Sequence, residues 1–271
     1  MRELTPARRL IAVFIAAILL SSLLHGFSGS RRWAKYEREM QSPSDDPPDA
    51  WDETEFAFAR LRFSGNRDRP RYRSWGIDSN TSERHFITGL RRLTRVYGRS
   101  VEHIVDIDSD EMFDWPWVYV VSGGDWVLTQ EEGDRLRKYF DRGGFLIVDD
   151  FHGESEWEQF MDGIRLAYPD AAGEDLDASH PVFHTVFDLS DRTIVPGYQI
   201  VENGRLWERG GSDTPYWRVI VDSKGRVQIA GFLNQDLGDA WEFSNDPAYP
   251  EHFASMAYRM GINYVVYSMT H

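Results

Sequence analysis

The chain has 271 residues with a formal net charge of −14, and residues 41–271 hold 23 Lys and Arg against 41 Asp and Glu. An acidic surface repels phosphate backbones, which excludes general nucleic-acid binding, and the absence of Cys removes disulfides, thiolate zinc sites and cysteine nucleophiles. The aromatic fraction of 14% indicates a folded body with ample apolar surface to bury.

Residues 1–30 are predicted to be a signal anchor or a signal peptide. Three Arg residues precede an uncharged apolar run from Leu10 to Leu24, a pattern typical of an export signal. No clear small-x-small cleavage site follows, which favours an uncleaved anchor, although cleavage and secretion stay open. We therefore expect contact with a membrane through this segment, a periplasmic body, and an extended Pro- and Asp-rich linker over residues 31–52.

Residues 53–271 are predicted to form one α/β domain. In chain order we expect a strand at 56–63, a helix at 81–97, a strand at 117–122, a helix closing near 143, a strand at 145–149, a helix at 154–167, a hairpin of 216–221 with 226–233, and a helix at 250–268. Alternating helices and strands favour a three-layer, Rossmann-like, mostly parallel sheet with helices on both faces, extended by the antiparallel hairpin.

Two capping boxes support the predicted helix starts. Asn80 stands three residues before Glu83, and Thr129 three residues before Glu132. The short apolar runs at 117–122 and 145–149 are each followed by small or polar residues, as expected of strands buried on both faces. These runs therefore predict two buried strands that pair in parallel through a helical crossover.

Three polar loops follow predicted strands, and in open α/β sheets ligands bind beyond the carboxyl ends of the strands. We therefore take the polar residues of these loops as candidate ligand-binding residues, without assigning a catalytic residue, a metal site or a cofactor. The candidates are Ser122, Asp125, Asp149, Asp150, His152, Asn234, Asp236 and Asp239.

Asp149 and Asp150 are adjacent, so on an extended strand their side chains leave opposite faces and reach one point only through a turn. One interpretation is that Asp150 or His152 caps the following helix. The other is that the carboxylates and His152 surround a hard cation or a polar substrate. Ser122 lacks the motif of a serine nucleophile, and the sequence contains no nucleotide-binding glycine motif.

Four segments together resemble the bacterial DUF4159 family, a domain of unknown function. They are Phe56 to Leu61, Gly143 to Phe151, Asp236 to Glu242 and Gly261 to Tyr267. The resemblance spans nearly all of residues 53–271. It implies a three-layer domain related to class I glutamine amidotransferase-like and flavodoxin-like folds, usually exported or joined to membrane segments.

The resemblance implies no established reaction. The related amidotransferases use a Cys nucleophile, which this chain lacks, so fold kinship does not carry that activity here. His152 stands where relatives commonly have an aromatic residue such as Trp. Two functions therefore remain open: a noncatalytic envelope domain that binds a small polar ligand or a partner protein, and a metal-assisted hydrolase or carbohydrate-active enzyme.

Overall fold

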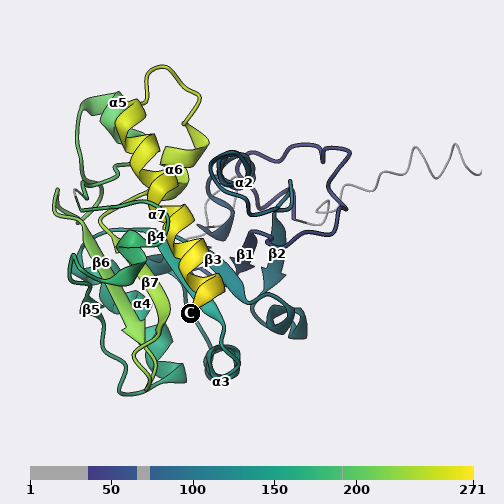
Figure 1. Ribbon diagram of the computed structural model, residues 1–271. Coiled ribbons are helices and arrows are strands. Elements are labelled where there is room, and N and C mark those ends of the chain that lie inside the picture. The colour runs from purple at the N-terminus through teal and green to yellow at the C-terminus, as the bar shows by residue number, and fades with distance from the viewer. Residues whose placement is uncertain (1–35, 66–73, 191) are drawn as a thin grey trace, which may run out of the picture. The chain divides into compact units, whose positions relative to one another are not determined.

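A seven-stranded sheet runs through the residues that the computed structural model describes, which are 36–65, 74–190 and 192–271 (Figure 1). The strand order is β2-β1-β3-β4-β7-β6-β5. The first five strands in this order pair in parallel, and β6 pairs antiparallel with both β7 and β5. The predicted mostly parallel α/β sheet with an antiparallel hairpin is thereby confirmed.

The strands are short, and the three in the middle of the sheet, β3, β4 and β7, are buried along their whole length. Their bounds are β1 Ala59–Arg62, β2 His103–Asp106, β3 Trp117–Val121, β4 Phe145–Phe151, β5 Glu174–Asp175, β6 Tyr216–Val221 and β7 Val227–Leu233. The helices are α2 Thr81–Leu93, α3 Gln130–Asp141, α4 Gly153–Ala167, α5 Gln199–Asn203, α6 Leu237–Glu242 and α7 Glu251–Thr270. Four short 3-10 turns, Ser74–Gly76, Asp110–Asp114, Gly123–Asp125 and Pro181–His184, lie between them.

The helices form two packed groups. Trp241 of α6 contacts Phe86 of α2 and Tyr119 of β3, with ring centroids 4.6 and 5.9 Å apart, and α7 packs on α2 and α6. Figure 1 shows α7 crossing in front of the sheet. In the second group α3 packs on α4, whose Phe160 contacts Phe151 of β4 at 5.7 Å.

Two local predictions differ from the structure. The capping box at Thr129 and Glu132 is present, but Asn80 makes no side-chain cap and instead donates to Glu102 at 2.8 Å. The predicted helix 81–97 ends at Leu93, because Thr94 is already extended. Strand β2 was not predicted, since its four residues are too few to show a period.

Residues 37–52, for which the sequence predicts an extended linker, contact the domain. Ala50 is fully buried, and Asp46 forms an ion pair with Arg84 of α2 at 2.8 Å. The backbone of Ser42 donates to the carbonyl of Ser79 at 2.7 Å. The predicted anchor at residues 1–30 lies outside the described residues, among which no helix is long and apolar enough to cross a membrane.

Candidate functional site

Three neighbouring parallel strands end in residues with left-handed backbone conformations. Ser122 after β3, Asp150 near the end of β4 and Asn234 after β7 have φ values of 51°, 51° and 66°. Such conformations cost about 1–3 kcal/mol each for residues other than Gly and concentrate at functional sites. The turn at Asp150 coincides with an irregular register between β4 and β7, so the chain supplies the turn that two adjacent carboxylates require.

Asp150 is the centre of a buried polar network. It accepts from the Ser122 hydroxyl at 2.7 Å, contacts His152 Nε2 at 3.2 Å, and pairs with Arg209 at 2.8 Å. Burial by itself raises its pKa, but Arg209, His152 and Ser122 together hold the pKa of Asp150 below its usual range. Asp150 is therefore an ionised carboxylate at neutral pH.

This network differs from a serine nucleophile site. The Ser122 hydroxyl donates to the Asp150 carboxylate and not to His152, so this network lacks the Ser–His pair that activates a serine nucleophile. His152 also makes no side-chain cap for α4, and Asp150 is engaged elsewhere. His152 stands at the N-cap position of α4, but neither side chain supplies the predicted helix cap.

Asp149 points away from Asp150 and faces α6. Its Oδ2 accepts from the backbone of Gly238 at 2.8 Å and from the Tyr119 hydroxyl at 3.1 Å, whereas Oδ1 is buried without a hydrogen-bond partner among the described residues. Burial, together with the nearby charge of Asp150, raises the pKa of Asp149 to about 8. The predicted pair of carboxylates thus separates into one ionised and one protonated group.

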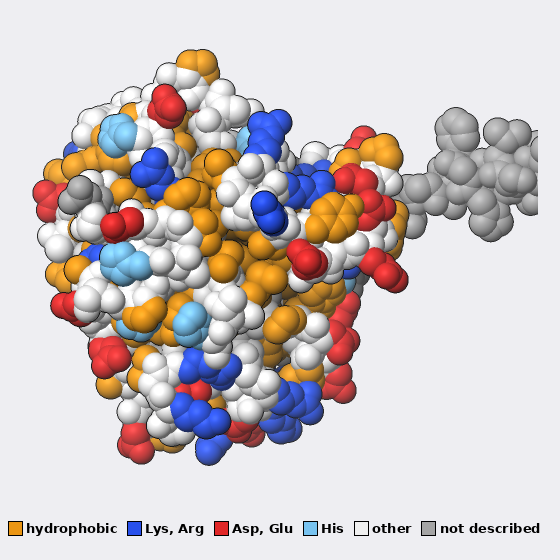
Figure 2. Space-filling model, in the orientation of Figure 1, with side chains coloured by type: hydrophobic (Ala, Val, Ile, Leu, Met, Phe, Trp, Pro, Cys, Tyr) orange, Lys and Arg blue, Asp and Glu red, His pale blue; other side chains and the backbone are white. Residues whose placement is uncertain are grey.

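A second group of acids lies beside this network, and we call it the carboxylate cluster. Asp239 belongs to two sets of possible ligands, one with Asp78 and Glu242 and one with Glu208 and Asp236, and within each set the ligand atoms lie within 4.8 Å of one another. Acidic side chains on the face shown in Figure 2 lie mainly towards its edges. The cluster is different, because Asp78, Asp236 and Glu242 are buried.

Gly197 holds part of the carboxylate cluster open. A side-chain methyl at this position would lie no more than 2.7 Å from Glu208 Oε1, Asp236 Oδ2 and Asp239 Oδ2. The three oxygens therefore face the same small space beside the Gly197 α-carbon. Any larger residue at position 197 would fill that space.

The acids of the cluster resist ionisation. Burial, and then repulsion between neighbouring carboxylates, raises the pKa of Glu208 to about 8, of Asp239 to about 6 and of Glu242 to about 7. The same causes raise the pKa of Asp78 and Asp236 well above the usual range. A bound cation would reverse this effect, because it favours the charged form of each carboxylate.

Local structure positions the cluster residues. Asp236 caps α6 by accepting from the backbone of Asp239 at 2.8 Å. The segment before β6 covers this edge of the sheet: the backbone of Tyr198 donates to Asp239 Oδ2 at 2.6 Å, and Arg209 pairs with both Asp150 and Glu156. Glu208, whose side chain is 22% exposed, lies at the solvent side of the cluster.

The eight predicted site residues divide into separate places. Asp150, His152 and Ser122 come together, and Asp236 and Asp239 join the carboxylate cluster. Asp125 instead accepts from Ser74 at 3.0 Å. Asn234 is used structurally, since its amide bonds the backbone of Gly153 and Thr214 at 2.9 and 2.8 Å.

Four residues of this region were not predicted: Asp78, Glu208, Arg209 and Glu242. Asp78 and Glu208 lie in connecting segments far from any strand-end motif, and only the tertiary fold brings them to the sheet edge. Glu242 is different, because it ends the Asp236 to Glu242 segment that carries the family resemblance, so that signal was available.

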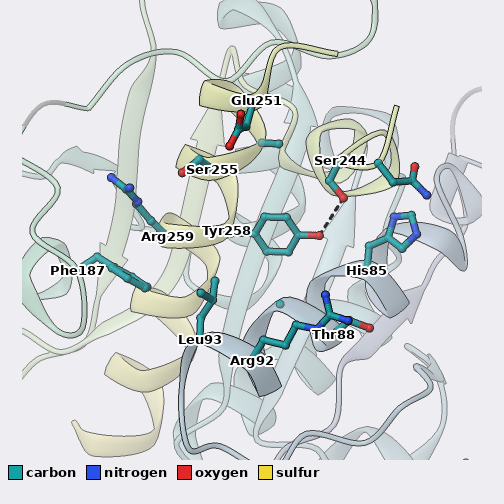
Figure 3. A pocket seen from close by; sticks show the side chains of 13 residues that line it. His85, Thr88, Arg92, Leu93, Phe187, Ser244, Glu251, Ser255, Tyr258 and Arg259 are labelled. Atoms are coloured by element: carbon teal, nitrogen blue, oxygen red, sulfur yellow. Dashed lines mark hydrogen bonds between the residues drawn. The ribbon is translucent and has the colours of Figure 1, made fainter. Parts of the chain in front are cut away.

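A separate hollow of about 560 Å³ lies between α2 and α7 (Figure 3). Some of its polar groups are engaged within the fold: the Tyr258 and Ser244 hydroxyls bond each other at 3.0 Å, and His85 Nδ1 contacts the Trp241 carbonyl at 2.9 Å. Figure 3 shows Arg92 and Arg259 extending from different helices without converging on one point. The carboxylate cluster is therefore the stronger candidate site.

Comparison with known proteins gives one assignment. A search of curated proteins finds no match for this sequence. Residues 57–269 match the family described as a domain of unknown function, DUF4159, which covers more than half of the chain. The chain therefore belongs to the DUF4159 family.

Proposed function

We propose that this domain binds a divalent cation at the carboxylate cluster, with Glu208, Asp236 and Asp239 as ligands. The observation that carries the proposal is the convergence of their three oxygens on the space beside Gly197. Carboxylate oxygens are the ligands preferred by hard cations such as Ca²⁺, Mg²⁺ and Mn²⁺. Two incompletely paired buried acids adjoin these ligands, because Asp78 Oδ2 and Glu242 Oε2 have no hydrogen-bond partner among the described residues.

The proposed cation offsets the electrostatic repulsion between the carboxylates of the cluster. Buried carboxylates at this separation repel one another, and their raised pKa values mean that protons must neutralise them in the absence of a metal. A divalent cation supplies the neutralising charge and coordinates several oxygens at once. Binding then raises the free energy of unfolding. At cation concentrations above the dissociation constant, this increase grows with the logarithm of the cation concentration.

Replacement of Gly197 tests this proposal. We expect Gly197→Ala in the purified full-length chain to weaken binding of Ca²⁺ or Mn²⁺ by at least about tenfold in equilibrium dialysis, because the new methyl displaces three ligands. Gly210→Ala is the matched control, since a methyl there meets no atom within 4 Å. Failure of the wild-type chain to bind any divalent cation at millimolar concentration would refute the proposal.

A second candidate function is metal-assisted hydrolysis, favoured by the ionised Asp150 with His152 beside it. Ligand atoms of these two residues and of Glu208 lie within 4.8 Å of one another, so a water bound to a cation on Glu208 would be near a base. We expect cation-dependent hydrolysis of an ester, phosphoester or glycoside substrate that Asp150→Asn abolishes while cation binding persists. A loaded protein that hydrolyses none of these substrates has a binding role only.

We further propose that the domain is Rossmann-like and tethered at the outer side of the cytoplasmic membrane. The parallel strand order β2-β1-β3-β4-β7 has the 2-1-3-4-5 pattern of flavodoxin-like sheets, and the basic and apolar sequence of residues 1–24 supports the tether. A C-terminal alkaline phosphatase fusion should be active and should sediment with membranes. An inactive fusion places the domain in the cytoplasm instead.

A further inference from the structure

The carboxylate cluster contains a second set of possible ligands beyond the three around Gly197. Glu208, Asp236 and Asp239 surround the space beside Gly197, yet Asp78 and Glu242 form a further set with the same Asp239. Asp239 Oδ2 faces Gly197 and accepts from the backbone of Tyr198. Because Asp239 belongs to both sets, its carboxylate lies between two groups of acidic oxygens.

Asp78 and Glu242 each present a buried oxygen without a protein partner. Asp78 is 1% exposed and Glu242 is 8% exposed, and neither Asp78 Oδ2 nor Glu242 Oε2 has a hydrogen-bond partner among the described residues. A buried carboxylate oxygen without a partner is costly unless a ligand satisfies it. These two oxygens therefore support a further ligand position independently of the three ligands around Gly197.

Arg60, whose charge acts on both Asp78 and Glu242, is already engaged elsewhere. Arg60 is fully buried and pairs with Glu83, and its remaining donors bond the carbonyls of Trp75 and Ile77 at 2.9 and 2.8 Å. Burial and the neighbouring acids raise the pKa of Asp78 and the charge of Arg60 only partly opposes this, while the N–H groups of Arg60 point to other acceptors. The side-chain hydrogen bonds of Arg60 therefore go to residues other than Asp78 and Glu242.

Local contacts hold Asp78 and Glu242 in place. The backbone of Asp78 donates to Gln41 Oε1 at 3.0 Å, and Glu242 is hydrogen-bonded by the side chain of Ser42. Gly238 gives Asp78 room, because a methyl at that position would collide with Asp78 Oδ2. The two carboxylates are thus supported by segments outside the first ligand set.

We infer that the carboxylate cluster binds two divalent cations, with Asp239 as the bridging ligand between a first ion on Glu208 and Asp236 and a second ion on Asp78 and Glu242. This inference rests on the proposed cation-binding function and adds a second position to it. Bridged two-metal sites hold their ions about 3.5–4 Å apart. At that separation two Mn²⁺ ions interact magnetically.

Mn²⁺ binding to the full-length chain tests the inference through stoichiometry and electron paramagnetic resonance. We expect two Mn²⁺ per wild-type chain with a spin-coupled signal. Asp78→Asn and Glu242→Gln should each bind one Mn²⁺ with an uncoupled signal, whereas Asp239→Asn should lose both ions. The charge-matched control is Asp162→Asn, an α4 side chain that is 70% exposed, and it should keep two coupled ions.

The possible failures have different meanings. A wild-type chain that binds one Mn²⁺, or two without spin coupling, overturns the second position but leaves the proposed function intact. A chain that binds no Mn²⁺ overturns both. If Asp78→Asn no longer unfolds cooperatively on heating, the Mn²⁺ spectra of the wild-type chain and of Glu242→Gln decide whether the second cation position exists. Retention of two coupled ions in a folded Asp78→Asn or Glu242→Gln chain also overturns the inference.

Discussion

Replacing Asp149 with Asn should remove a large pH dependence from the stability of the chain. Burial raises the pKa of Asp149 to about 8, whereas the unfolded chain has an ordinary carboxyl near 3.8. The native state therefore keeps a proton that the unfolded state releases. The resulting stabilisation is full below the unfolded pKa and is lost as pH rises through about 8.

The expected change in unfolding free energy comes from the one proton that Asp149 binds in the native state and not in the unfolded state between pH 5 and pH 7. Between pH 5 and pH 7 the unfolded carboxyl is ionised and native Asp149 is protonated, so wild-type stability falls by about 1.3 kcal/mol per pH unit from this group, or about 2.5 kcal/mol in total. Asn has a similar shape and can still accept from Gly238 and Tyr119. The stability of Asp149→Asn relative to wild type should thus rise by about 2.5 kcal/mol over this range.

Urea unfolding of the full-length chain at pH 5 and pH 7, with a chelator present, measures this double difference. Contributions from other titrating groups cancel to the extent that Asp149 does not alter them. For a chain of this size the change corresponds to about 5–10 °C in melting temperature. A difference between wild type and Asp149→Asn that stays constant within about 0.5 kcal/mol would show that Asp149 is ionised in the native state and that our reasoning is wrong.

Three further outcomes are expected. Cation affinity should rise between pH 5.5 and 8.5, because Glu208 and Asp239, whose pKa values are about 8 and 6, must release their protons to bind. Calorimetry in buffers of different ionisation enthalpy measures the number of protons released. Arg60→Leu should cost about 3–5 kcal/mol in urea unfolding, since it leaves a buried carboxylate unpaired, whereas the surface control Arg165→Leu should cost less than about 1 kcal/mol. Ser42→Ala should weaken the second Mn²⁺ several-fold and leave the first unchanged in dialysis.

Local sequence signals predicted most of the sheet and its helices. The apolar runs of β3 and β4 are visible in sequence because both faces of these strands are covered, and the Thr129 capping box uses only residues three positions apart. The predicted capping box at Asn80 does not form, because tertiary contacts engage both of its side chains. Asn80 donates to Glu102, and Glu83 pairs with buried Arg60, so neither side chain is available for the helix end.

The candidate site was predicted only in part because its ligands come from distant segments. Asp236 and Asp239 follow β7 directly and were therefore found by the strand-end rule. Asp78 precedes α2 and Glu208 lies in the long segment before β6, and each looks like an ordinary solvated acid in sequence. The burial of Asp78 and the approach of both acids to Asp239 depend on how two connections fold over the same edge of the sheet.

The strained strand ends and the repelling carboxylates occur at one edge of an otherwise regular sheet. Ser122, Asp150 and Asn234 each cost about 1–3 kcal/mol in backbone energy, which is a large share of the roughly 5–15 kcal/mol that stabilises a domain. Packing of the buried sheet and the side-chain hydrogen bonds of these residues must together offset that cost. A left-handed turn at Asp150 separates its carboxylate from that of Asp149, and this separation places one ionised acid beside Arg209 and one protonated acid beside α6. Apolar residues in the same places would make a purely structural edge more stable, so the acids at this edge favour the proposed binding role.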